Sequence, residues 1–289
     1  MRKKVALYLM TEKGRYSLKK ILEKSYHVDY VVYSDYINND ESKSEEIKKL
    51  SELYNITCFE RKNAPKIQEE YIIAIGWKWI INSDKVIVFH DSLLPKYRGF
   101  NPLPTALING DKEIGVTAII ANENYDSGDI VAQKSIGINY PIKIYDAIEK
   151  IKVLYADMLE KIIELLGEYN SLPSYKQNNN EATYSLWRDD EDYKIDWTQS
   201  SEYIKRKIDA VGYPYDGAYT ILNNKIYRIH DAEVVSDLPI INRTPGKIIF
   251  KEGEHPIIVC GSGLLKIYNL INEDSEDVIS KIKFRSRFK

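Results

Sequence analysis

The chain has 289 residues, of which 44% are hydrophobic and 29% charged, and its formal net charge is −2. This composition is typical of a globular protein with a real core, and it excludes a disordered chain. The nearly balanced charge gives no overall attraction to nucleic acid or to an anionic membrane. The six-residue apolar run after the basic N-terminus is too short for a signal peptide or a membrane span, so we expect a cytoplasmic protein.

Motifs for metals and nucleotides do not occur in the sequence. Cys58 and Cys260 lie far apart without CxxC or Cys/His spacing, so neither a structural zinc site nor any other metal site is expected. No GxGxxG follows the first apolar run, and no P-loop motif occurs anywhere. Dinucleotide and nucleoside triphosphate sites of the usual kind are therefore disfavoured.

The first half of the chain alternates short apolar runs with amphipathic segments. This alternation predicts an α/β fold with a mostly parallel, Rossmann-like sheet covered by helices on both faces. After residue 10, a turn containing Gly14 is expected to lead into the first helix. The expected strands are residues 4–10, 28–33, 71–75, 86–89, 114–121 and 130–138, and the later helices are residues 42–54, 102–109 and 145–169.

Residues 171–185 contain Ser, Asn and Pro and lack hydrophobic periodicity, so we interpret them as a linker. The linker predicts a division of the chain into domains of residues 1–180 and 181–289. Short strands with turn residues between them predict a small β-rich second domain, a sandwich or an OB-like barrel. The second domain is expected to contain a helix at 200–211 and strands at 218–222, 225–229, 247–250, 257–260 and 264–268.

His90 stands out among the four histidines because of its position. It ends the apolar strand VIVF and precedes an irregular loop, and ligands of open α/β sheets bind beyond the carboxyl ends of the strands. A second loop, YDSGD, carries Asp126 and Asp129. A carboxylate bonded to one imidazole nitrogen would fix its tautomer and suit it to general-base catalysis. His27, His230 and His255 are interpreted as surface or structural residues.

Three segments in order, HDSLLPKYRGFNP, INGDKEIGVTA and YDSGDIVAQ, resemble the N10-formyltetrahydrofolate-dependent formyltransferases. That family contains methionyl-tRNA formyltransferase and the nucleotide-sugar N-formyltransferases. The resemblance continues in KIDW, in DAVGYPYDGAY and in CGSGL, and so covers most of the chain. It implies a formyltransferase that takes its one-carbon group from N10-formyltetrahydrofolate.

The resemblance assigns catalytic roles to two residues. His90 would be the general base that takes a proton from the attacking amine, and Asp126 would orient its imidazole. The family has an asparagine two residues before the histidine, where this chain has Val88, which cannot donate to the developing oxyanion. The protonated His90, Lys78, Asn101 or a backbone amide could supply that donor; otherwise the register is displaced, or the site only binds ligands.

Residues 74–80, AIGWKWI, align with the segment that lines the pterin pocket of the family, largely through backbone groups. The resemblance therefore implies that Gly76, Trp77, Lys78 and Trp79 bind the folate. The alternative for Trp77 is that its ring is part of the core at a strand end.

Charge helps to choose the amine that accepts the formyl group. Residues 181–289 contain 16 Lys and Arg against 18 Asp and Glu, a net of −2, whereas a transfer RNA requires extensive phosphate neutralisation. We therefore expect a small nucleotide sugar as acceptor and no nucleic acid or membrane partner. Lys205, Arg206 and Tyr213 lie near the GYPYDG turn and, with Asn101, are candidates to bind this acceptor.

The resemblance is strongest to enzymes that formylate amino-deoxy sugars for surface glycans, with a UDP-4-amino-4,6-dideoxy sugar of the pseudaminic acid type as the nearest named acceptor. Two alternatives stay open: a methionyl-tRNA formyltransferase, and a non-catalytic protein that binds folate or a sugar nucleotide. The nucleotide, the sugar and any pairing of subunits into a homodimer are left open by the sequence.

Overall fold

The computed structural model describes residues 3–34, 42–66 and 71–289. Contacts group the chain into two compact units, which are described separately. The first comprises residues 1–102, 113–137 and 148–185, and the second comprises residues 103–112, 138–147 and 186–289. The division into domains at residue 180 stays a prediction.

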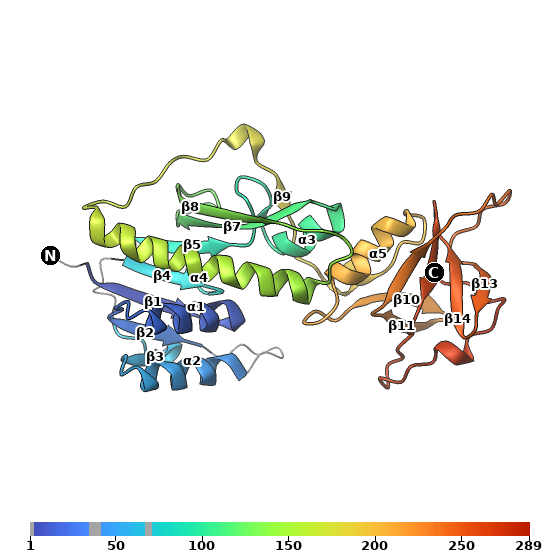
Figure 1. The fold of residues 1–289 in the computed structure, drawn as a ribbon, viewed down its shortest axis with the longest axis horizontal. Coiled ribbons are helices and arrows are strands. Elements are labelled where there is room, and N and C mark those ends of the chain that lie inside the picture. Colours follow the sequence, from blue (N-terminus) through green and yellow to red (C-terminus); the bar gives the residue numbers. More distant parts are fainter. Residues whose placement is uncertain (1–2, 35–41, 67–70) are drawn as a thin grey trace. The chain divides into compact units, whose positions relative to one another are not determined.

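Strands and helices alternate in the first unit, as the sequence predicts (Figure 1). Most of the expected elements are confirmed to within two residues at each end. Its elements are β1 (Val5–Leu9), α1 (Thr11–Glu23), β2 (Tyr30–Tyr33), α2 (Ser42–Leu53), β3 (Cys58–Glu60), β4 (Tyr71–Ile75), β5 (Val86–His90), β6 (Arg98–Gly99), β7 (Glu113–Ile120), β8 (Ile130–Gly137), most of α4 (Ile144–Glu168) and β9 (Tyr184–Ser185).

Seven strands form one sheet in the order β3-β2-β1-β4-β5-β7-β8. The first five of these are parallel, and β7 and β8 join antiparallel at one edge. The predicted mostly parallel α/β sheet is therefore confirmed. The carboxyl ends of β1, β4 and β5 meet at one edge of the sheet, and the loops that follow them are brought together there.

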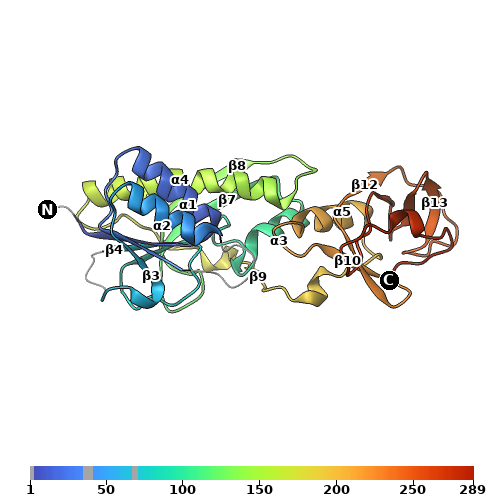
Figure 2. The same cartoon turned by 90° about the horizontal axis from the view of Figure 1, so that it is seen from below.

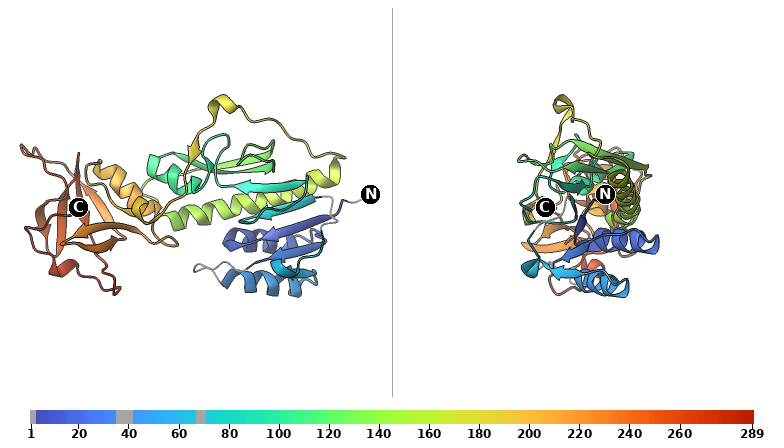
Figure 3. Two further views of the ribbon diagram at one scale, coloured as in Figure 1. Left: turned by 180° about the vertical axis from the view of Figure 1, so that it is seen from behind. Right: turned by 90° about the vertical axis from the view of Figure 1, so that its left-hand side faces the viewer.

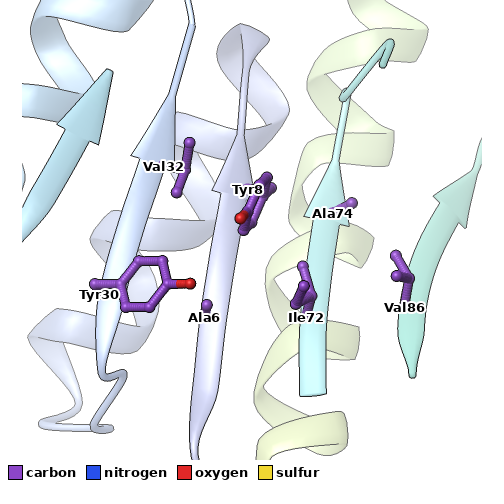
Figure 4. Packing of buried hydrophobic residues seen from close by; sticks show 7 residues of the cluster. All are labelled: Ala6, Tyr8, Tyr30, Val32, Ile72, Ala74 and Val86. Atoms are coloured by element: carbon purple, nitrogen blue, oxygen red, sulfur yellow. The ribbon is translucent and has the colours of Figure 1, made fainter. Parts of the chain in front are cut away.

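Helices cover the sheet on one face rather than on both. Figure 2 shows α1, α2 and α4 on the same side of the strands. On the other face, side chains such as Tyr8, Ile72 and Val86 form an apolar cluster (Figure 4). The side chains that pack against this cluster come from strands and loops, among them Trp77 and Ile81. The expectation of two helical layers was wrong. In the described part of the chain, side chains from loops and strands cover the second face of the sheet.

Gly14 lies inside α1, where the sequence predicted a turn before the helix. A Cβ on Gly14 would stand 3.2 Å from the Cβ of Leu9 on β1. The missing side chain thus lets the first turn of α1 pack directly against β1. The helical propensity lost at this glycine, about 1 kcal/mol, is offset by that close packing.

A charged cluster joins α1 and α4 to the end of β5. Lys13 Nζ lies 2.5 Å from the Asp91 carboxylate, and the hydroxyl of Tyr155 on α4 donates to the same group. Burial by itself would raise the pKa of Asp91, but the ion pair with Lys13 and the bond from Tyr155 lower it overall. Burial and the Asp91 charge raise the pKa of Tyr155, whose ring also stacks on Phe89.

We predict that Asp91→Asn lowers the free energy of unfolding at pH 7 by about 2 kcal/mol, because it leaves the Lys13 ammonium uncompensated. The native pKa of Asp91 is depressed, so its contribution is present above the unfolded pKa of about 3.9 and is lost as the pH falls through the native value. Urea unfolding of both proteins should show their difference shrinking below about pH 4.

Asp157→Asn is the matched control, since Asp157 pairs with Lys134 at the surface, where both side chains are more than two-fifths exposed. It should change stability by less than about 1 kcal/mol. An equal loss in the two variants would contradict a special role for the Lys13–Asp91 pair.

The second unit is β-rich, as expected, and its sheets are antiparallel. The hairpin β10-β11 forms one sheet, and a second has the order β12-β15-β14-β13. Strand β12 was not predicted from the sequence. The elements of this unit are α3 (Pro102–Asn109), the first residues of α4, α5 (Ser201–Ala210), β10 (Ala218–Leu222), β11 (Lys225–Ile229), β12 (Ala232–Val235), β13 (Ile248–Glu252), β14 (His255–Val259) and β15 (Leu264–Ile267).

Across the described residues, none of the helices combines the length and the apolar character needed to cross a membrane.

Candidate active site

His90 is the last residue of β5, and the sheet fixes its position. It pairs with Thr117 of β7 on one side, while the parallel neighbour β4 ends beside the same strand. Only 7% of the residue is exposed. The imidazole is therefore held at the carboxyl edge of the sheet rather than carried on a mobile loop.

Asp126 approaches His90 from the loop between β7 and β8. Its Oδ1 lies 3.5 Å from His90 Nδ1, and its Oδ2 accepts a hydrogen bond of 2.8 Å from the backbone N–H of Gly99. Asp126 has a φ of +50°, an uncommon conformation for a residue with a side chain. The structure thus brings together the two residues that the sequence singled out as catalytic, and a backbone donor fixes the carboxylate.

The other ring nitrogen of His90 also faces oxygen, since Nε2 lies 2.7 Å from the carbonyl of Tyr97. A neutral imidazole has one N–H and can donate to only one of these two oxygens. The protonated ring has two N–H groups and can donate to both. An oxygen atom therefore faces each ring nitrogen of His90.

Gly99 permits the close approach that holds Asp126. Its φ is +100°, and a Cβ at this position would lie 2.6 Å from the carbonyl oxygen of Ser185. The backbone of β6 therefore runs against β9, with Arg98 opposite Tyr184 and Gly99 opposite Ser185. Only glycine combines this φ with this contact without strain.

Val88 lies two residues before His90 on β5, where the related enzymes have asparagine. Its side chain packs against Leu94, Ile119 and Ile130. It also packs against the apolar cluster of Tyr8, Ile72 and Val86 on the face of the sheet opposite the helices. Val88 thus has an apolar side chain that lies among other apolar side chains. A donor for a developing negative charge has to come from another group.

The segment predicted to bind folate follows β4, the strand next to β5. Trp77 packs edge-on against Tyr8 and Trp79, with ring centroids 5.0 and 5.2 Å apart. The guanidinium of Arg61 lies 4.3 Å over the Trp79 ring. The Trp77 ring is thus part of the apolar cluster, so any contact of this residue with a ligand would have to use mainly its backbone.

Gly76 begins that segment and lies beside Thr11 at the start of α1. A Cβ on Gly76 would stand 2.9 Å from Thr11 Oγ1. This hydroxyl oxygen is buried and has no hydrogen-bond partner in the described part of the chain. Of the two side-chain candidates for the oxyanion donor, Lys78 is exposed in the loop after β4, and Asn101 is half-buried directly before α3.

Lys205, Arg206 and Tyr213 lie in the second unit. Lys205 Nζ is 2.6 Å from the buried Asp209 carboxylate, and Arg206 Nε donates to the carbonyl of Ile108. Both cations are thus engaged within the unit. Tyr213 is 75% exposed, and its ring lies 6.2 Å from that of Tyr145, so it is the most accessible of the three.

The sequence did not reveal the role of residues 171–185, which were interpreted as a linker. Gln177 bonds to Arg98 and to the backbone of the Asp126 loop, and Thr183 and Ser185 contact the backbone around Tyr97. Arg98 is 4% exposed, whereas a loop arginine is usually solvated. A buried arginine requires acceptors, but nothing in the sequence reveals its burial.

Comparison with known protein families gives two matches. Residues 61–157 match the Formyl transferase family, and residues 188–281 match the Formyl transferase C-terminal domain. A methionyl-tRNA formyltransferase from Thermodesulfovibrio yellowstonii is 32% identical over 232 residues, which cover 78% of this chain and 72% of that protein. The chain belongs to the formyl transferase family.

Other relatives are matched over a shorter part of their length. The methionyl-tRNA formyltransferase from Caldanaerobacter subterraneus subsp. tengcongensis is 34% identical over 186 residues, or 64% of this chain. The chain spans 59% of that relative and 55% of the one from Lactococcus lactis subsp. lactis, which is 35% identical over 62% of this chain.

Two solved structures share the fold over nearly the whole chain. WlaRD, a sugar 3N-formyl transferase solved with dTDP and 5-N-formyl-THF, has a TM-score of 0.70 at 22% identity, covering 92% of this chain and 97% of that one. An N-formyltransferase from Helicobacter canadensis, solved with folinic acid and dTDP-3-aminofucose, has a TM-score of 0.70 at 21% identity, covering 93% and 100%. At these identities the likeness establishes the shared fold.

We predict that Gly99→Ala lowers the free energy of unfolding by about 3 kcal/mol, since the new Cβ would be strained at this φ and would meet the Ser185 carbonyl. Gly253→Ala is the control, because Gly253 has a φ of +60° but nothing within 4 Å of the added atom. It should cost about 1 kcal/mol from conformation alone. Equal losses in urea unfolding would show that the approach to Ser185 is not restrictive.

Proposed function

We propose that this protein transfers a formyl group from N10-formyltetrahydrofolate to the amine of a nucleotide-linked amino-deoxy sugar. The observation that carries the proposal is the approach of the Asp126 carboxylate to Nδ1 of His90 at the end of β5. Membership of the formyl transferase family supports the reaction class. The fold shared with sugar N-formyltransferases is compatible with a small acceptor.

In this proposal His90 removes a proton from the acceptor amine as the amine attacks. An amine that delivers its proton to Nε2 has to take the place that the Tyr97 carbonyl occupies in this structure. The resulting imidazolium is stabilised by the nearby Asp126 carboxylate, which Gly99 holds in position. Positioned proton transfer of this kind typically contributes about 10²- to 10⁴-fold to a rate.

The residues after β4 fit a folate. A pterin is a flat ring with polar edges, so it requires an apolar wall and nearby hydrogen-bonding groups. The packed rings of Tyr8, Trp77 and Trp79 hold the segment in place, and the half-buried Trp79 offers apolar surface. The backbone of residues 76–79 and Thr11 Oγ1, which has no partner among the described residues, offer polar atoms. When bound, the folate would supply the formyl group.

Replacing either His90 or Asp126 should abolish most formyl transfer without loss of folate binding. We expect His90→Ala and Asp126→Ala to lower kcat by about 10²-fold or more, because proton removal and ring orientation act in the transition state. Radiolabelled formyl transfer measures kcat, and calorimetry with 5-formyltetrahydrofolate measures binding. His27→Ala, at a histidine whose side chain is 52% exposed, should behave like the wild type.

Near-normal turnover of His90→Ala would eliminate this mechanism. Normal folate binding combined with no transfer by the wild-type protein across a broad acceptor panel would instead favour a non-catalytic binding protein.

The charges of residues 181–289 favour a sugar nucleotide over a transfer RNA. Residues 181–289 have a net charge of −2, and the three consecutive cations of α5 are engaged internally. Lys205 pairs with Asp209, Arg206 donates to Ile108 O, and Lys207 donates to Lys194 O. This helix therefore offers no free row of cations for phosphates, which binding to a polynucleotide requires.

We expect formylation of amine-bearing UDP- or dTDP-sugars and no activity on initiator methionyl-tRNA. Mass spectrometry of the products, which would gain one formyl group, is the direct assay. Relatives of 32 to 34% identity are methionyl-tRNA formyltransferases, so that class is the second candidate. Transfer to methionyl-tRNA, with binding that weakens steeply as salt rises, would select it.

Restoring the asparagine of related enzymes should have little effect. If the protonated His90 stabilises the oxygen that gains negative charge, Val88→Asn changes kcat by less than about tenfold, or under about 1.4 kcal/mol in the barrier. Val88→Ala controls for the apolar contacts with Leu94 and Ile119 that both substitutions disturb. A gain of about 100-fold in Val88→Asn would show that the natural site lacks a donor it needs.

A further inference from the structure

The segment between α4 and β9 runs beside the β8 edge of the sheet, as Figures 1 and 3 show. Tyr175 forms an antiparallel bridge with Ile130 of β8, and the segment ends in β9 beside β6. Between residues 173 and 181, Gln177 alone is not exposed. In this stretch Gln177 bonds to the loop that carries Asp126, and both Gln177 and Asn179 accept hydrogen bonds from Arg98.

Gln177 joins two loops of the active site through a single amide. Its Nε2 donates to the carbonyls of Asp126 and Gly128, both at 2.8 Å. Its Oε1 accepts from Nε and Nη2 of the buried Arg98, at 3.0 and 2.8 Å. The site requires donors on one side and an acceptor on the other, which a glutamate or a lysine cannot supply together.

Other residues of the segment hold the second oxygen partner of His90. Thr183 Oγ1 accepts a hydrogen bond of 2.9 Å from the backbone N–H of Tyr97, and Ser185 Oγ lies 3.4 Å from the Tyr97 carbonyl oxygen. Tyr97 has a φ of +58°, which a tyrosine adopts only when its surroundings impose it. The segment therefore contacts the backbone of both residues that face the imidazole.

We infer that Gln177 is a positioning residue for formyl transfer, which acts through the backbone of Asp126 to keep that carboxylate against His90. The inference rests on the proposed function, because its kinetic test requires an acceptor. Asp126 has a positive φ, so the bond to its own carbonyl fixes a conformation that the residue would otherwise leave. Gly99 holds the side chain of Asp126, and Gln177 holds its main chain.

Two variants separate the halves of the amide. Gln177→Met keeps the length of the side chain and removes every hydrogen bond, whereas Gln177→Glu keeps an acceptor for Arg98 and removes the donors to Asp126 and Gly128. We expect both to lower kcat by about tenfold to 100-fold, with the KM of donor and acceptor within about threefold of the wild type. Asn178→Ala, at the exposed neighbouring residue, should leave kcat unchanged.

A double-mutant cycle with Asp126→Ala identifies the route of the effect. If Gln177 acts only by positioning the Asp126 carboxylate, replacing it should have little effect once that carboxylate is absent. Gln177→Met should therefore lower kcat by less than about twofold in the Asp126→Ala background. A full further loss in the double variant would overturn the inference and indicate a general structural role. Wild-type kcat in Gln177→Glu would overturn it too, because only the contact with Arg98 would then matter.

NMR of the imidazole nitrogens tests the inference without an acceptor. Among the signals of the four histidines, that of His90 is the one missing from the spectrum of His90→Ala. The ¹⁵N shifts of His90 should change in Gln177→Met and stay constant in Asn178→Ala. Unchanged shifts in Gln177→Met would overturn the inference. If the wild-type protein formylates no amino sugar nucleotide, the proposed function fails while this measurement still decides the role of Gln177.

Discussion

Two oxygen atoms face the ring nitrogens of His90: the Asp126 carboxylate orients the ring through Nδ1, and the Tyr97 carbonyl holds the place at Nε2 that an attacking amine has to take. Asp126 Oδ1 lies 3.5 Å from Nδ1, and the Tyr97 carbonyl lies 2.7 Å from Nε2. Both oxygens belong to residues with a positive φ, so neither position is the relaxed state of its own loop. The end of β5 supplies the histidine, and the rest of the unit has to hold these two loops against it. A positive φ costs conformational free energy at Tyr97 and at Asp126, and the hydrogen bonds to the backbone of these residues offset that cost.

Three contacts do most of this holding, and each comes from a different part of the chain. The backbone of Gly99 fixes the Asp126 carboxylate, Gln177 fixes the main chain of Asp126, and Thr183 fixes the N–H of Tyr97. Arg98 is buried behind them and donates to Gln177 and Asn179. The histidine's own strand contributes apolar packing instead, since Val88 contacts Leu94 and Ile130. Polar control of this site thus comes from the loops and from the segment that follows α4.

The sequence predicted the sheet well because its signals are local. Apolar runs such as residues 71–75 and 86–89 identify buried strands, and a histidine at a strand end indicates the edge where ligands bind. The contacts of residues 171–185 were not predicted because their hydrogen bonds reach residues about 50 to 90 positions away, which no periodicity records. Gly14 was misplaced for a related reason, since a glycine indicates a turn by local rules but here lies inside α1 and permits contact with Leu9.

Chemical rescue is the most direct test that His90 works as a proton acceptor in transfer. Imidazole added to His90→Ala should restore formyl transfer in a concentration-dependent way, and a series of azoles should give rates that rise with the basicity of the added azole. The same additions should leave Asp126→Ala unchanged, because its histidine is still present. Full turnover of His90→Ala without any azole, or rescue that is independent of azole basicity, would contradict the account.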